Sequence, residues 1–207
     1  MWRLLGVTFD ESALNEDQDL WILQNLLGAG FRSLELALHP RALGNARAGK
    51  LRTAGQNLGF SFAFHAPDFI DPEIFDLRYA MSSEHSRGAL RNWIEQCGDF
   101  GDNVQLIFHG APDQTATFRF VDFALEWIEK TRGSQRLLIE NTFSAEPSEV
   151  RYGQKPEALL QLIQVFSGSS LGLCLDIAHW LRALNQGIYP KGLVEQCAST
   201  DFDSEVL

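Results

Sequence analysis

Five side chains of the metal-binding type each follow a short apolar run. FSFAF precedes His65, VQLIF precedes His109, RLLI precedes Glu140, and LGLCL precedes Asp176, with His179 three residues further on. Short apolar runs of this kind predict buried strands, and a residue that leaves a strand at its end lies at the edge of the sheet. Imidazoles and carboxylates are ligands of zinc, manganese and iron. Four successive strands carrying such residues to one edge would build a divalent metal site.

Each of these residues also has a plainer interpretation. A single strand-end histidine is commonly a hydrogen-bonded structural residue, and Glu140 could pair with an arginine, because a buried carboxylate needs a partner. The local pattern repeats, however, as FHAP at His65 and FHGAP at His109, and the repetition favours ligands. We therefore predict that His65, His109, Glu140, Asp176 and His179 bind metal. Within this set Glu140, Asp176 and His179 are the predicted catalytic residues.

Three other residues of similar chemistry are weaker candidates. His39 and His85 are the remaining histidines of the chain, and we predict a surface loop for the first and the solvated face of a helix for the second. Glu35, within LELAL, faces either the interior of the fold, where it could contact substrate, or a helix, where it would form a salt bridge.

The elements that must position these residues alternate along the chain. Strands are predicted over 3–9, 31–38, 60–66, 104–110, 136–141 and 171–177, and helices over 17–27, 51–60, 80–98, 118–129 and 156–165. Trp21, Trp93 and Trp127 match helix faces and are predicted to pack in the core. Alternation of this kind predicts βαβ units and a parallel sheet. Because several strands contribute candidate residues from their carboxyl ends, a (β/α)8 barrel is favoured over an open sheet.

Composition narrows the class of protein. The chain has 207 residues, 45% of them hydrophobic, and a formal net charge of −10. These values predict a single domain over 1–207, and the acidic charge argues against long nucleic acid as a partner. Cys97, Cys174 and Cys197 form no CxxC pair, which suits reduced thiols and the cytoplasm. We expect no membrane span, and the sequence contains no GxGxxG or phosphate-loop motif.

The motifs LELAL, FHAP, VQLIFHGAP, IENT and GLCLDIAH, in this order, resemble the xylose isomerase-like TIM-barrel superfamily. That superfamily includes endonuclease IV-type apurinic/apyrimidinic endonucleases and many sugar isomerases and epimerases. Resemblance to the endonucleases implies that His65, His109 and Glu140 hold one zinc, that Glu140 and Asp176 hold a second, and that His179 serves a third. Resemblance to the isomerases implies instead a single metal, zinc or manganese, on Glu140 and Asp176, with His179 near the substrate.

The carboxyl-terminal part of the chain departs from both patterns. Both branches are expected to carry a histidine after a seventh strand and a glutamate after an eighth, and no histidine follows His179. We therefore expect an α/β fold of the (β/α)8 TIM-barrel type with about six parallel strands, strands seven and eight being absent. The chain would then be a fragment, a truncated gene product, or a barrel completed by a partner. Open strand edges favour association, so a homo-oligomer is expected. The polar loop over 144–156 is a candidate lid.

Three functions remain open on these grounds. The histidine pair favours a hydrolase that acts on a small phosphoester through a zinc-activated water. The alternative is a metal-dependent isomerase or epimerase that acts on a sugar or sugar phosphate. The third is an inactive truncated remnant or a subunit that a partner completes. In the first two cases the cofactor is a divalent metal, zinc being favoured over manganese, and the partner is a small molecule.

Overall fold

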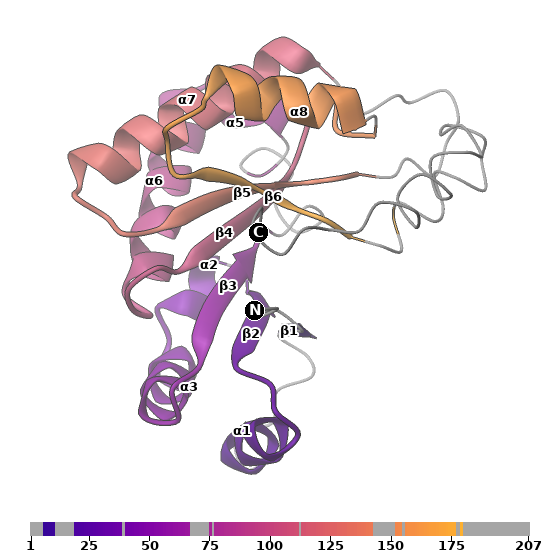
Figure 1. The fold of residues 1–207 in the computed structure, drawn as a ribbon. Helices are drawn as coiled ribbons and strands as arrows, with labels where there is room; N and C mark the ends of the chain where they lie inside the picture. The colour runs from indigo at the N-terminus through magenta and orange to yellow at the C-terminus, as the bar shows by residue number, and fades with distance from the viewer. Residues whose placement is uncertain are drawn as a thin grey trace, which may run out of the picture.

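Strands and helices alternate along the chain in the computed structural model (Figure 1). It describes residues 6–10, 19–38, 40–66, 75, 77–111, 113–142, 152–154, 156–176 and 179, with backbone only at 6–10, 19, 20, 40, 41, 78 and 156. The strands are β1 (Gly6–Asp10), β2 (Ser33–Ala37), β3 (Ser61–His65), β4 (Gln105–His109), β5 (Arg136–Glu140) and β6 (Leu171–Cys174). The helices are α1 (Asp19–Gly28), α2 (Pro40–Leu43), α3 (Ala46–Asn57), α5 (Leu77–Ala80), α6 (Glu84–Gly98), α7 (Gln114–Lys130) and α8 (Pro156–Val165).

The six described strands form one parallel sheet whose spatial order follows the chain order, from β1 to β6. A doubly wound open sheet would instead reverse its strand order at a switch point. Uninterrupted sequential order is the arrangement of a barrel, in which each helix returns the chain to the next strand on the same side. The prediction of an α/β fold with about six parallel strands is therefore confirmed.

Side chains alternate between the two faces of the sheet. Outward-facing residues join the helices in one large core. A smaller cluster lies on the inner face and comprises Ala63, Ile107, Leu138 and Cys174. Since strand residues two positions apart share a face, the last residues of β3, β4 and β5 stand on this inner face. These last residues are His65, His109 and Glu140.

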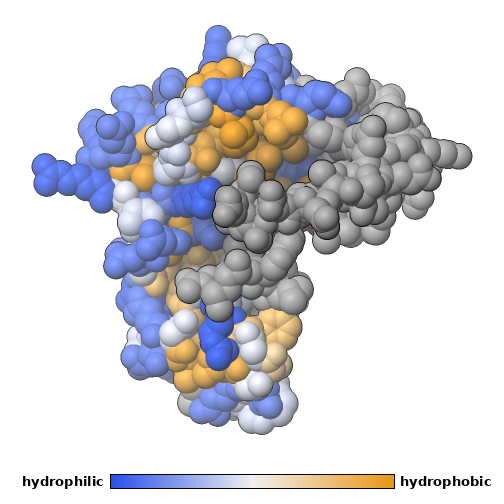
Figure 2. Space-filling view, in the orientation of Figure 1, coloured by the Kyte–Doolittle hydropathy of each residue, from blue (hydrophilic) through white to orange (hydrophobic). Residues whose placement is uncertain are grey.

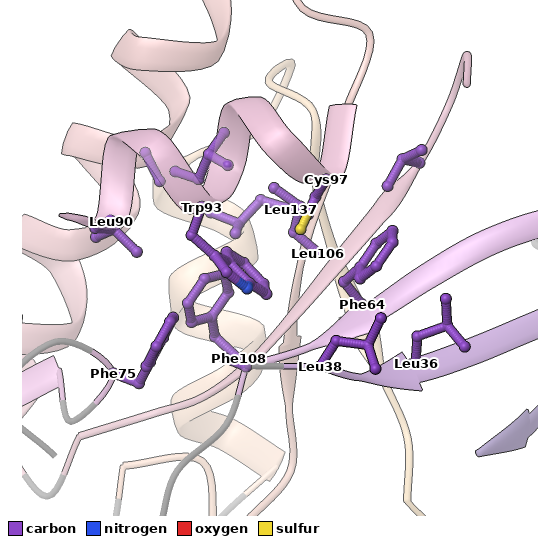
Figure 3. Close-up of a cluster of buried hydrophobic side chains, with 14 of the residues drawn as sticks. Leu36, Leu38, Phe64, Phe75, Leu90, Trp93, Cys97, Leu106, Phe108 and Leu137 are labelled. Atoms are coloured by element: carbon purple, nitrogen blue, oxygen red, sulfur yellow. The ribbon is translucent and has the colours of Figure 1, made fainter. Parts of the chain in front are cut away.

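Aromatic side chains hold the helices against the outer face (Figure 3). The ring of Trp93, on α6, meets those of Phe75 and Phe108 edge-on, with centroids 5.4 and 5.3 Å away. Phe108 also lies 4.6 Å from Phe120 of α7, and all four side chains are almost fully buried. The predicted core position of Trp93 is confirmed. The same prediction is wrong for Trp21, which is 66% exposed on α1.

Capping residues explain where three helices begin. The side chains of Asn45, Ser83 and Asp113 accept hydrogen bonds from backbone N–H groups in the first turns of α3, α6 and α7. Such caps satisfy donors that have no partner within the helix. Helix α3 therefore starts at residue 46 rather than the predicted 51, and α7 at 114 rather than 118. The predicted helix over 80–98 is instead the short α5 followed by α6, which starts at residue 84.

Among the described residues, β1 and β6 form the two edges of the sheet. Exposed apolar side chains gather at the β6 edge: Leu160 and Val165 of α8 are 55% and 58% exposed, and Leu173 is 42% exposed. Figure 2 shows apolar surface in the region of α8. Association through these edges stays a prediction. Within the described part of the chain, no helix combines the length and apolar character needed to cross a membrane.

Candidate metal centre

The strand register brings the predicted residues to one edge of the sheet. His65, His109 and Glu140 are the last residues of β3, β4 and β5, and His109 pairs with Glu140 across the two neighbouring strands. Asp176 follows the end of β6 by two residues, which keeps it on the inner face, and His179 lies three residues further along the chain. All five predicted ligands are therefore brought together at the carboxyl ends of four consecutive strands.

Glu140 lies at the centre of this group and is only 4% exposed. Its Oε2 atom is 2.9 Å from Nε2 of His65 and 3.3 Å from Nε2 of His109. Its Oε1 atom is 3.6 Å from Nδ1 of His179, which is in turn 3.7 Å from Oδ2 of Asp176. This carboxylate belongs to two sets of three potential metal ligands. One set is His65, His109 and Glu140, and the other is Glu140, Asp176 and His179. Within each set, one potential ligand atom of each residue lies within 4.8 Å of the other two.

The imidazole of His65 is fixed from both sides. Its Nδ1 lies 2.9 Å from the carbonyl oxygen of Ala66, and its Nε2 faces Glu140. Both neighbours accept hydrogen bonds, so the metal-free ring satisfies both when both nitrogens carry a proton. The ring also stacks edge-on against that of His109, with centroids 4.8 Å apart. Packing and hydrogen bonding thus hold Nε2 towards the shared carboxylate.

A second group of contacts joins Asp176 and His179 to Asn141. The backbone N–H of His179 donates to Oδ1 of Asp176 at 2.9 Å, and its Nδ1 lies 3.0 Å from the carbonyl oxygen of Asn141. The amide side chain of Asn141 bonds both the N–H and the carbonyl of Asp176. The sequence interpretation assigned no role to Asn141. The available signal was its position in IENT, immediately after a strand-end glutamate.

The electrostatics of the pair formed by Glu140 and His65 favour opposite charges. Burial raises the pKa of Glu140, but hydrogen bonds and charge from His109 and His65 outweigh burial and hold this pKa at about 2. Burial likewise lowers the pKa of His65. The charge of His109 also lowers this pKa. The hydrogen bond to Glu140, the negative charge of Glu140 and the carbonyl of Ala66 raise it by more, so the pKa of His65 lies above 6.5.

This pair should make the stability of the metal-free chain depend on pH. A lowered pKa at Glu140 stabilises the fold above the ordinary value of 4.5 and loses this effect as the pH falls towards about 2. A raised pKa at His65 stabilises below 6.5 and loses this effect as the pH rises through the folded value. We expect the pair to contribute most between pH 4.5 and pH 6.5. Urea unfolding with chelator present, of wild type and Glu140→Gln, checks this; a difference in unfolding free energy that does not change with pH would contradict it.

The donor chemistry fits a divalent cation. A metal-binding histidine commonly donates its second N–H to a backbone carbonyl, which leaves the other nitrogen for the metal. His65 bonds Ala66 in this way through Nδ1, and its Nε2 faces Glu140. His179 also bonds a backbone carbonyl, that of Asn141, through its Nδ1. The depressed pKa of Glu140 keeps it anionic at neutral pH, as a metal ligand must be. These side chains could therefore hold a metal between them.

Two further side chains of the inner face lie close to the site. Cys174 pairs in register with Glu140 and is a half-buried free thiol. Burial, followed by the charges of Glu140, Glu35 and Asp176, raises its pKa to about 12. Cys174 packs against Ala63, Ile107 and Leu138 and forms part of the floor of the site. Glu35 is half-buried on β2 and pairs with Ala63 of the inner cluster, which places it on the interior-facing side of the strand.

Within the loop predicted as a lid, side chains are described at 152–154, where they are buried, and residue 156 begins α8. The backbone N–H of Tyr152 donates to the carbonyl of Ala111 at 2.8 Å. A Cβ atom at Gly110 would clash with the carbonyl oxygen of Tyr152, so glycine permits this close approach directly after His109. The segment thus supports the ends of β4 and β5. Of the weaker candidates, His85 is exposed on α6 as predicted, whereas His39 lies outside the described residues.

The fold and the site together define an α/β protein of the TIM-barrel type with a histidine and carboxylate cluster at the carboxyl ends of its strands. No protein-family profile matches the sequence, and no curated protein matches it. The relationship to known proteins is therefore one of structure.

Three solved structures are similar to this chain. The TTHB071 protein from Thermus thermophilus, soaked with ZnCl2, gives a TM-score of 0.57 at 20% identity, covering 84% of this chain and 66% of that one. The 3-keto-D-glucoside 4-epimerase YcjR from E. coli gives 0.55 at 12% identity, covering 86% of this chain and 73% of the epimerase. A D-psicose 3-epimerase in the presence of D-fructose gives 0.53 at 12% identity, covering 84% and 63%.

These neighbours are xylose isomerase-like TIM-barrel proteins, and the similarity establishes the fold. This chain spans 66% of TTHB071 and 63% of the psicose epimerase. The predicted resemblance to the superfamily is confirmed at the level of fold. Neither of the two named enzymes among them is an endonuclease, so the narrower resemblance to endonuclease IV stays a prediction.

Proposed function

We propose that this chain is a divalent-metal-dependent enzyme that isomerises or epimerises a small sugar or sugar phosphate. The proposal depends on one observation: the buried carboxylate of Glu140 lies close to Asp176 and His179 at the carboxyl ends of the strands. We call this end of the sheet the mouth. Two neighbours in fold are named as sugar epimerases. This support favours the isomerase alternative over the phosphoester hydrolase favoured by the sequence.

The exposure of the two carboxylates separates their roles. The side chain of Glu140 is 6% exposed, whereas that of Asp176 is 33% exposed and that of His179 is 24% exposed. Glu140 is therefore assigned to metal binding. Asp176 and His179 are the groups that a substrate entering the mouth would touch. Moving a proton between neighbouring carbons requires such a group within hydrogen-bond reach of the substrate.

A divalent cation, when bound by Glu140 and Asp176, would polarise the carbonyl and hydroxyl oxygens of a sugar. Nδ1 of His179 lies 3.0 Å from the carbonyl oxygen of Asn141. With Nδ1 used in this way, Nε2 is the nitrogen that His179 would offer to a substrate oxygen or to a cation. Mixed nitrogen and oxygen donors suit zinc or manganese. We assign zinc as the first candidate, because His65 and His109 add two further imidazoles to the mouth.

A specific observation also supports the zinc-dependent phosphoester hydrolase. The two oxygens of Glu140 face different groups, Oε2 towards His65 and His109 and Oε1 towards His179. A carboxylate placed in this way can bridge two cations, and paired cations serve phosphoester hydrolysis well. TTHB071, a neighbour in fold, was soaked with ZnCl2. With a net charge of −10, a small phosphoester suits this chain better than a long nucleic acid.

Joint replacement of His65 and His109 by alanine separates the two reactions. If the chain is an isomerase, the double variant should keep a cation on Glu140, Asp176 and His179. It should then lose less than about tenfold in kcat/KM, or about 1.4 kcal/mol. If the chain is a hydrolase, the variant should lose both bound metal and phosphodiesterase activity. Metal content, deuterium incorporation from D2O into ketoses and sugar phosphates, and hydrolysis of a nitrophenyl phosphodiester provide the measurements.

Deuterium incorporation is the decisive readout for the proposed function, because abstraction of a carbon-bound proton exchanges it with solvent and ester hydrolysis does not. His85→Ala serves as the matched control, since this histidine is exposed on α6, away from the strand ends. A double variant that is inactive and free of metal would rule out the isomerase arrangement. Absence of deuterium exchange in the metal-loaded wild type, for every sugar tested, would rule out the proton transfer assigned to Asp176 and His179.

A further inference from the structure

Asn141 makes more specific contacts at the mouth than its place beside Glu140 suggests. It is 3% exposed. Its side-chain Nδ2 donates to the carbonyl of Asp176 at 2.9 Å, and its Oδ1 accepts from the N–H of Asp176 at 2.6 Å. The side-chain amide of Asn141 thus bonds both the N–H and the carbonyl of Asp176, which lies beyond the last residue of β6.

The backbone of Asn141 extends the same arrangement. Its N–H donates to the carbonyl of Cys174 at 3.3 Å, and its own carbonyl accepts from Nδ1 of His179 at 3.0 Å. When Nδ1 carries the proton, the lone pair of His179 is on Nε2. Nδ1 is also 3.6 Å from Glu140 and 3.7 Å from Asp176, longer than a hydrogen bond. Among these three described neighbours, the carbonyl of Asn141 is therefore its acceptor.

We propose that Asn141 is a positioning residue that holds Asp176 and His179 as one preformed pair of ligands, separate from His65 and His109. The proposal rests on the proposed function in that the pair serves the same metal-dependent site. Asn141 acts through Asp176 and His179 and does not itself touch the reacting atoms. Its amide replaces the strand pairing that ends at Cys174 and so fixes the backbone of Asp176, whose side chain in turn accepts from the N–H of His179.

Loss of the amide should weaken only this half of the site. In Asn141→Ala the affinity for Zn²⁺, measured by calorimetry on metal-free protein, should fall about 10- to 100-fold, as for other residues that orient metal ligands. In a chain that already carries Asp176→Ala and His179→Ala, the same substitution should change the affinity by no more than about twofold. An equal fall in both backgrounds would overturn the proposal.

Asn141→Asp provides a second variant in case the alanine variant folds poorly. It keeps an oxygen for the N–H of Asp176 and replaces the donor that faces the Asp176 carbonyl by a second acceptor. The added negative charge by itself would attract a cation. A lower Zn²⁺ affinity in this variant can therefore come only from lost positioning, and an unchanged or higher affinity would count against the proposal.

A matched control separates positioning from general stability. Gln135 is also a buried amide, 8% exposed, and stands immediately before the first residue of β5, at the opposite end of the strand from Glu140. Its Nε2 donates to the carbonyl of Ile94. Gln135→Ala should lower the melting temperature and leave the Zn²⁺ affinity unchanged. If Gln135→Ala lowers the affinity as much as Asn141→Ala does, the effect of Asn141 is general destabilisation and the proposal fails.

Amide hydrogen exchange tests the positioning without any metal. In Asn141→Ala the N–H groups of Asp176 and His179 should exchange faster, whereas that of Ala66, which bonds the carbonyl of Ile107 at the same mouth, should not change. Failure of the wild type to bind any metal would refute the proposed function and leave this measurement intact. Unchanged exchange at Asp176 and His179 would refute the role of Asn141.

Discussion

Replacement of Glu140 by alanine should remove bound metal from both halves of the site and abolish activity. Both ligand sets include this carboxylate, so its loss leaves two imidazoles on one side and Asp176 with His179 on the other. We expect kcat/KM to fall at least roughly 10³-fold, which corresponds to about 4 kcal/mol of transition-state stabilisation. Metal content by mass spectrometry, followed by the sugar and phosphodiester assays, gives the measurement.

The control for this prediction is Glu140→Gln, which keeps the volume and removes the charge. In the metal-free chain Glu140→Ala also leaves the Nε2 atoms of His65 and His109 facing an empty volume, and a buried polar group without a partner costs about 1–3 kcal/mol. The glutamine should recover part of that stability and none of the metal binding. Stoichiometric metal in Glu140→Ala would show that the centre of the site lies elsewhere.

Much of this site is predictable from sequence because strand periodicity determines it. His65, His109 and Glu140 each end a strand and stand two residues after a member of the inner apolar cluster. A side chain at such a position must face inward and lie at the carboxyl edge of the sheet. Parallel pairing in chain order then brings the three together. This reasoning needs only the apolar runs and their alternation with helices, both of which are local features.

The contacts of Asn141 and the exposure of Trp21 depend on tertiary structure and could not be predicted in the same way. The side chain of Asn141 bonds the backbone of Asp176, which lies 35 positions later in the sequence, and no local sequence pattern predicts that contact. Trp21 has the spacing of a buried helix residue, yet the helix leaves it 66% exposed. Which oxygen of Glu140 faces which histidine likewise depends on the register of β3, β4 and β5. The cap at Asn45, by contrast, is a local signal that would have corrected the predicted start of α3.

The largest effect on stability should come from Trp93→Ala. Trp93 is fully buried on α6, between Phe75 and Phe108, and Phe108 directly precedes His109 on β4. Replacing such a side chain removes buried apolar surface and leaves a cavity, which costs about 3–5 kcal/mol. For a chain of this size, that corresponds to a fall in melting temperature of roughly 6–20 °C.

Trp21→Ala is the matched control, because it removes the same side chain from an exposed position on α1 and should change the unfolding free energy by no more than about 0.5 kcal/mol. Urea unfolding of both variants gives the comparison. Because Phe108 points outward and His109 inward from the same strand, loosening the outer packing should also weaken metal binding at the mouth. Equal stability of the two variants would mean that the helices do not pack on the sheet as described. The Trp93→Ala variant could instead be destabilised and still bind metal with wild-type affinity. That result would show that hydrogen bonds at the strand ends hold the ligands independently of the outer core.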